Sequence, residues 1–155
     1  MFLIKGTIAM SFIKNIFKRD YDKYEGVRRI NIYLLRFLYA LMFFMLGQTT
    51  WTGIFTHEGP WDPNKAVAWS VWTAFATLAG LGILHPLKML PILLLEIFYK
   101  ILWLALVAYP LWSKGTLEGS TAEGITMVFF PVFLVIFIIP WGYVYKNYIR
   151  FSRRT

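Results

Sequence analysis

The chain has no cysteine and only two histidines among its 155 residues. Disulfides and thiol chemistry are therefore excluded, and neither His57 nor His85 has the nearby Cys or His partner that a zinc or haem site would use. The sequence also lacks a glycine-rich phosphate loop, a nucleophile elbow and a paired-carboxylate motif. We therefore expect no metal and no cofactor.

Acidic residues are also scarce, with 8 Asp and Glu against 16 Lys and Arg, and a formal net charge of +8. A strongly basic chain is a candidate for binding nucleic acid. Here, however, the basic residues lie beside long apolar runs, where cytoplasmic anchoring charges and contacts to anionic lipid are found. The charge pattern predicts a lipid bilayer as the partner and no nucleic acid.

What the chain has in excess is apolar residues, at 58% of the total, where soluble domains average about 45–50%. They form four runs, at about 30–54, 66–84, 88–111 and 124–145. Each run is close to the ~20 residues that a helix needs to cross a bilayer. These runs predict an all-α fold, an integral membrane four-helix bundle over residues 30–146, with a kink in the fourth helix at Pro131 and Pro140.

The flanking segments are basic. Residues 1–29 form a cytoplasmic N-terminal segment in which Phe12, Ile13, Ile16 and Phe17 share one face of a short amphipathic helix. A solvated, charged leader is the alternative, and Met10 is an alternative to Met1 as first residue. Residues 147–155 form a basic cytoplasmic tail.

The charges also predict the topology. Cations precede the first apolar run, lie between the second and third, and follow the fourth, whereas the two other connections hold more acidic than basic residues. Because positive residues accumulate on the cytoplasmic side, both termini are expected in the cytoplasm.

Local signals predict two helix starts and one close helix contact. Asp62, directly before a proline, is typical of an N-cap, and Ser120 with Glu123 fits a capping box. Ala76 and Gly80 form a small-x-x-x-small pair, which permits another helix to approach closely.

Three charged residues lie inside the apolar runs: Arg36, Glu96 and Lys100. Each costs roughly 2.5–3.5 kcal/mol at the centre of a bilayer, so we expect them to face protein or water. Arg36 and Glu96 are expected at similar depths, ~9 and ~12 Å from the cytoplasmic end at 1.5 Å per residue. Lys100 lies one turn further, in the favourable order for a pair with Glu96.

Two interpretations of these charges remain open. In the first interpretation, the three residues form a structural cluster that determines which helices pack together. Alternatively, they form a polar site walled by Tyr39, Tyr99 and Trp103, with one excess positive charge, suited to an anionic or carbonyl-bearing ligand such as a lipid headgroup or a quinone.

The layout resembles the DoxX-like group of small four-span bacterial membrane proteins. The shared pattern covers most of residues 30–146: an early charge in the first span (Arg36), a Gly- and Ala-rich second span (74–82), and an entry to the third marked by Pro86, Lys88 and Pro91. The resemblance implies a protein of the bacterial cytoplasmic (inner) membrane, accessory to a redox or biosynthetic system. Without cysteine, this chain lacks the means for thiol–disulfide work.

Three functional hypotheses follow. The first is a non-enzymatic accessory or ligand-binding protein whose polar cluster binds another membrane protein, a second copy of itself or a small amphiphile. The second is an intramembrane enzyme, or a subunit of one, acting on a lipid- or quinone-like substrate with Glu96 as acid or base and Arg36 or Lys100 as electrostatic stabiliser. The third is a small transporter that works as an oligomer.

Overall fold

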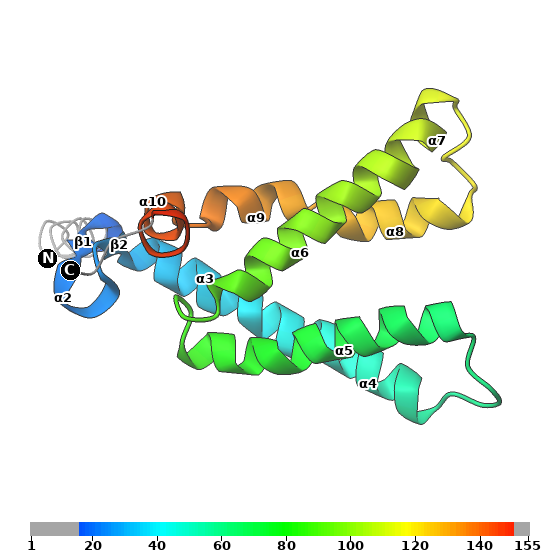
Figure 1. The fold of residues 1–155 in the computed structure, drawn as a ribbon, viewed down its shortest axis with the longest axis horizontal. Helices are drawn as coiled ribbons and strands as arrows, with labels where there is room; N and C mark the ends of the chain where they lie inside the picture. The colour runs from blue at the N-terminus through cyan, green and yellow to red at the C-terminus, as the bar shows by residue number, and fades with distance from the viewer. Residues whose placement is uncertain (1–15, 151–155) are drawn as a thin grey trace, which may run out of the picture. The chain divides into compact units, whose positions relative to one another are not determined.

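A computed structural model describes residues 16–150, which divide into two compact units. The first consists of residues 16–90 with 140–150, and the second of residues 91–139. Four helical stretches are long and apolar enough to cross a membrane: Arg29–Phe55, Pro63–Leu84, Leu90–Ser113 and Thr121–Ile138 (Figure 1). The prediction of a helical chain with four such helices is confirmed. Most of the predicted N-terminal amphipathic helix, and the end of the basic tail, lie outside the described residues.

The first unit begins with a small ribbon. Strands β1 (Arg19–Asp20) and β2 (Val27–Arg28) pair antiparallel on either side of α2 (Tyr21–Tyr24). The chain reverses at Glu25 and Gly26, whose φ values of 51° and 82° are both left-handed, and glycine adopts this conformation without steric cost. The sequence pattern did not predict the ribbon, because two-residue strands are too short to show an alternation of apolar and polar residues.

Asp20 holds this ribbon to the first long helix. Its carboxylate caps α2 by accepting from the Lys23 amide at 3.0 Å, and it also accepts from Arg29 Nε at 3.0 Å. The bond from the Lys23 amide, helped by the bond and charge of Arg29, lowers the pKa of Asp20 below its usual 3.8. The carboxylate therefore stays ionised and occupied by these two partners at neutral pH.

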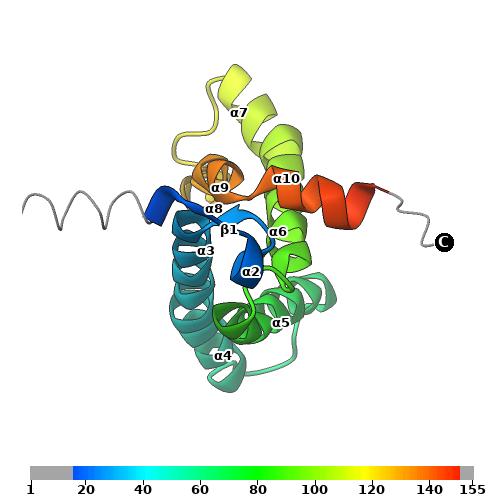
Figure 2. The same cartoon turned by 90° about the vertical axis from the view of Figure 1, so that its left-hand side faces the viewer.

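The first long helix is continuous through three segments, α3 (Arg29–Leu41), the wider π-helical η1 (Met42–Leu46) and α4 (Gly47–Phe55). It lies side by side with α5 (Pro63–Leu84), as Figures 1 and 2 both show. Helix α5 begins as predicted: Asp62 accepts from the Lys65 amide at 2.9 Å, and a proline occupies the first turn.

Small residues on α5 permit the close contact between these two helices. Ala76 is fully buried, and a Cβ at Gly47 would lie 3.7 Å from its methyl group. A Cβ added at Gly80 would lie 2.9 Å from the Phe43 ring, and one at Gly82 would lie 2.5 Å from Cγ of Tyr39. The predicted role of Ala76 and Gly80 in close packing is confirmed, and Gly82 extends it.

Two tyrosine hydroxyls secure the backbone after α5. Tyr39, which is fully buried, donates to the carbonyl oxygen of Pro86 at 3.2 Å. Tyr148 donates to the carbonyl oxygen of Leu87 at 3.1 Å from the C-terminal part of the first unit, which comprises α10 (Trp141–Val144) and η3 (Tyr145–Ile149). These bonds pair carbonyl oxygens in the turn that follows α5, where Leu87 also accepts from the Leu90 amide at 3.4 Å.

The second unit contains two helical stretches. One is α6 (Leu90–Trp103), continued by η2 (Leu104–Ala108) and α7 (Tyr109–Ser113); the other comprises α8 (Thr121–Phe129) and α9 (Val132–Ile138). Ser120 caps α8 as predicted, accepting from the Ala122 amide at 3.3 Å. The capping-box glutamate differs from expectation, because Glu123 accepts from the Gly119 amide at 2.8 Å rather than from Ser120.

The fourth apolar helix ends earlier than predicted. The sequence suggested one kinked helix to Tyr145, whereas α9 stops at Ile138 and Ile139 is extended, with ψ of 128°. A residue before proline is disfavoured in the helical conformation, and Pro140 has no N–H to continue the ladder. Pro131 separates α8 from α9 less sharply, because the residue before it, Phe130, keeps a helical conformation with ψ of −37°.

Substituting Gly82 with alanine tests the close contact on α5. The new methyl group would meet the buried Tyr39 ring, and overpacking of this kind costs about 1–3 kcal/mol. The matched control is Gly124→Ala on α8, where a Cβ meets nothing within 4 Å and no loss is expected. The measurement is the free energy of unfolding in mixed micelles. Equal stability of the two variants would contradict the proposed contact.

Candidate functional site

The six residues predicted to form a polar site are divided between the two units. Arg36 and Tyr39 lie on α3 in the first unit. The other four lie on one face of α6 in the second unit, at the spacing i, i+3, i+4, i+7: Glu96, Tyr99, Lys100 and Trp103.

Glu96 and Lys100 form an ion pair within α6. Lys100 Nζ lies 2.5 Å from Glu96 Oε1, and the side chains are only 15% and 10% exposed respectively. Both residues lie in the stretch Leu90–Ser113, whose mean hydropathy is 2.1, so their neighbours along the helix are mostly apolar. The pair neutralises both charges in place, which is how charged groups are kept within an apolar helix.

Phe129 on α8 packs against the face of α6 that carries these four residues. Lys100 Nζ lies 5.5 Å from the centroid of its ring, within range of a cation–π contact. The rings of Tyr99 and Trp103 meet it edge to face, with centroids 5.6 and 5.2 Å away. The four predicted α6 residues and Phe129 thus form one group, here called the α6–α8 cluster. Sequence reasoning missed Phe129 because nothing distinguishes it from its apolar neighbours.

Tyr39 has a packing role in the first unit. Its ring lies against Gly82 and its hydroxyl donates to the Pro86 carbonyl, so the side chain joins α3 to the end of α5. The predicted role as the wall of a ligand site is not needed to explain its burial.

Arg36 is different, because one nitrogen of its half-buried side chain has no partner within the described residues. Its Nε is buried and has no hydrogen-bond partner there. Buried polar atoms are nearly always paired, so such an atom calls for a specific explanation. A guanidinium nitrogen in this position can donate to an anionic or carbonyl oxygen supplied by another molecule.

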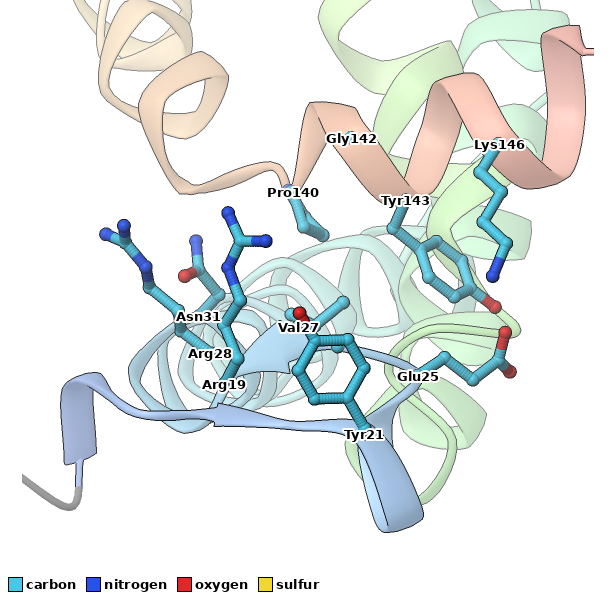
Figure 3. A pocket seen from close by; sticks show the side chains of 11 residues that line it. Arg19, Tyr21, Glu25, Val27, Arg28, Asn31, Pro140, Gly142, Tyr143 and Lys146 are labelled. Carbon is cyan, nitrogen blue, oxygen red and sulfur yellow. The ribbon is translucent and has the colours of Figure 1, made fainter.

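A second group of charged residues, here called the basic pocket, surrounds a cavity of about 400 Å³ in the first unit (Figure 3). It lies between the β1–β2 ribbon and the start of α10, at the beginning of α3 (Figure 3). The polar side chains lining it include Arg19, Glu25, Arg28, Asn31, Tyr143 and Lys146. From the sequence, these cations indicated only which side of the membrane the termini occupy. The ribbon that brings them together has strands too short to be recognised from the sequence.

Across residues 16–150 the structure has no group of three or more His, Cys, Asp or Glu side chains that could hold a metal ion. No protein-family model matches the chain, and no curated protein or solved structure matches it either. The DoxX-like resemblance therefore stays a prediction.

A double-mutant cycle tests the ion pair. Lys100→Met leaves Glu96 as an unpaired charge and is expected to cost about 3 kcal/mol or more, as does breaking other buried pairs. Glu96→Gln combined with Lys100→Met removes both charges and is expected to cost clearly less than the sum of the two single changes. The free energy of unfolding in micelles measures all three variants, and additive losses would show that the pair contributes no coupling.

Proposed function

We propose that the protein is a small multi-pass protein of the bacterial inner membrane, DoxX-like in layout and with both termini in the cytoplasm. It acts as a non-enzymatic accessory that binds a small amphiphile with an anionic or carbonyl-bearing head. The observation that carries this proposal is the buried Nε of Arg36, which has no acceptor among the described residues.

The membrane assignment is supported by the four apolar helices and by the charges at their ends. The large apolar side chains left exposed on the helices, such as Phe37, Leu106, Phe130 and Phe137, would be costly in water and suit contact with lipid. The concentration of Lys and Arg before the first span and after the fourth supports the cytoplasmic placement of both termini.

The ligand class is supported by where charge remains uncompensated. Glu96 and Lys100 cancel one another within the α6–α8 cluster, whereas Arg36 keeps its positive charge and a buried donor. Leaving such a donor without a partner costs about 1–3 kcal/mol or more, because the group has lost its water. A ligand oxygen that accepts this bond would recover that free energy and give the ligand its specificity.

No catalytic role is assigned to Glu96. Its carboxylate is paired with Lys100 at 2.5 Å, and this pairing accounts for its place within an apolar helix.

Native mass spectrometry of protein purified gently from its own membranes tests the proposal. Wild type is expected to retain a stoichiometric small-molecule adduct, and Arg36→Met is expected to reduce its occupancy at least tenfold. Lys88→Met is the matched control, because it removes one exposed cation outside the membrane helices and should leave the adduct unchanged.

The thermal unfolding midpoint of each variant shows whether a lost adduct reflects a lost fold. A wild-type protein that carries no small molecule, or one bound only to another polypeptide, would contradict the proposal. So would an adduct that Arg36→Met leaves in place.

A further inference from the structure

Two arginines face each other across the β1–β2 ribbon. Arg19 and Arg28 are direct cross-strand partners, and both line the basic pocket (Figure 3). Like charges in directly opposite positions of an antiparallel pair destabilise it. A negative charge close to both guanidinium groups would remove this repulsion.

The described residues do not supply that charge. Asp20, the nearest carboxylate in the ribbon, is occupied by Arg29 and by the Lys23 amide. Glu25 lies on the side of the pocket occupied by Tyr143 and Lys146, away from the two arginines (Figure 3). Within residues 16–150, Arg19, Arg28 and Lys146 have no carboxylate within ion-pair distance.

Two further lining residues carry side-chain hydrogen-bond donors. Asn31 carries an amide and Tyr143 a hydroxyl. Burial, and then the negative charge of Glu25 and the neighbouring Tyr148, raises the pKa of Tyr143, so its hydroxyl stays protonated and able to donate. The guanidinium forks of Arg19 and Arg28 match the oxygens of a phosphate group, and Tyr143 and Lys146 supply further donors on the other side of the pocket (Figure 3).

We propose that the basic pocket binds a phosphate group, seated between the Arg19 and Arg28 side chains. The bound phosphate removes the repulsion between the two arginines and so stabilises the ribbon. The site is separate from Arg36 and shares with the proposed function only the membrane location of the chain.

The position of the pocket favours a lipid headgroup as the source of the phosphate. Arg28 directly precedes the apolar helix that begins at Arg29, so the pocket lies where that helix would leave the hydrocarbon. Basic residues at this level attract the anionic lipids of the cytoplasmic leaflet. A soluble phosphate monoester offers the same chemistry, and the experiment separates the two sources.

The test measures lipid binding by the full chain in neutral detergent, using native mass spectrometry with added phosphatidylglycerol or phosphatidylcholine. Wild type is expected to bind phosphatidylglycerol at least tenfold more tightly than phosphatidylcholine. The double variant Arg19→Gln/Arg28→Gln is expected to lose this preference. The matched control Lys18→Gln/Lys23→Gln removes the same charge from exposed positions outside the pocket and should keep it.

Competition identifies the source of the phosphate. Displacement of phosphatidylglycerol by millimolar glycerol 3-phosphate or inorganic phosphate would support the phosphate site with a soluble ligand as its occupant. Retention of the lipid would support the headgroup as occupant. Arg36→Met should leave this binding unchanged, so the result does not depend on the Arg36 site.

If the double variant does not fold, the single variant Arg28→Gln provides the test. Because it relieves the repulsion, it is expected to raise the unfolding midpoint in lipid-free detergent while weakening phosphatidylglycerol binding at least fivefold. Three results would overturn the proposal: a wild type without preference for the anionic lipid, arginine variants that bind like wild type, or a lysine control that loses as much binding as the arginine variants.

Discussion

The buried side chain of Tyr39 is the contact on which the first unit depends. Its ring occupies the space that Gly82 leaves open on α5, and its hydroxyl pairs with the Pro86 carbonyl where that helix has ended. One residue therefore determines how closely α3 and α5 approach and also satisfies a backbone group that has left the helix. Tyr148 repeats the second of these roles at Leu87, which brings the C-terminal segment to the same stretch of backbone.

Several other polar groups inside the apolar helices are satisfied within their own helix. The hydroxyls of Thr73 and Thr77 donate hydrogen bonds to carbonyl oxygens one turn earlier, and Lys100 pairs with Glu96 on the same helix. Each of these bonds is made within a single helix and so survives in any lipid environment. Arg36 Nε has no such partner among the described residues, and this contrast is the reason for associating a ligand with it.

Some charged residues at the start of the first long helix hold the fold together, and others have no partner of opposite charge in the described part of the chain. The Asp20 carboxylate accepts hydrogen bonds from the Lys23 amide, which caps α2, and from Arg29 Nε, so it joins the ribbon to the start of α3. Arg19 and Arg28 then remain opposite each other without a carboxylate in the described part of the chain. Because Asp20 is occupied by Lys23 and Arg29, Arg19 and Arg28 remain available for an anion from outside.

The sequence by itself determined what depends on neighbours along the chain. The four apolar helices follow from the length of the apolar runs. The caps at Asp62 and Ser120 and the Glu96–Lys100 pair follow from residue types at short spacings along the chain. Only the tertiary structure decided which distant groups meet: Phe129 with the α6 face, Tyr39 with Gly82, and Arg19 with Arg28. These contacts depend on chain reversals and helix packing. Spacing along a helix carries no information about which residue of another element will lie opposite.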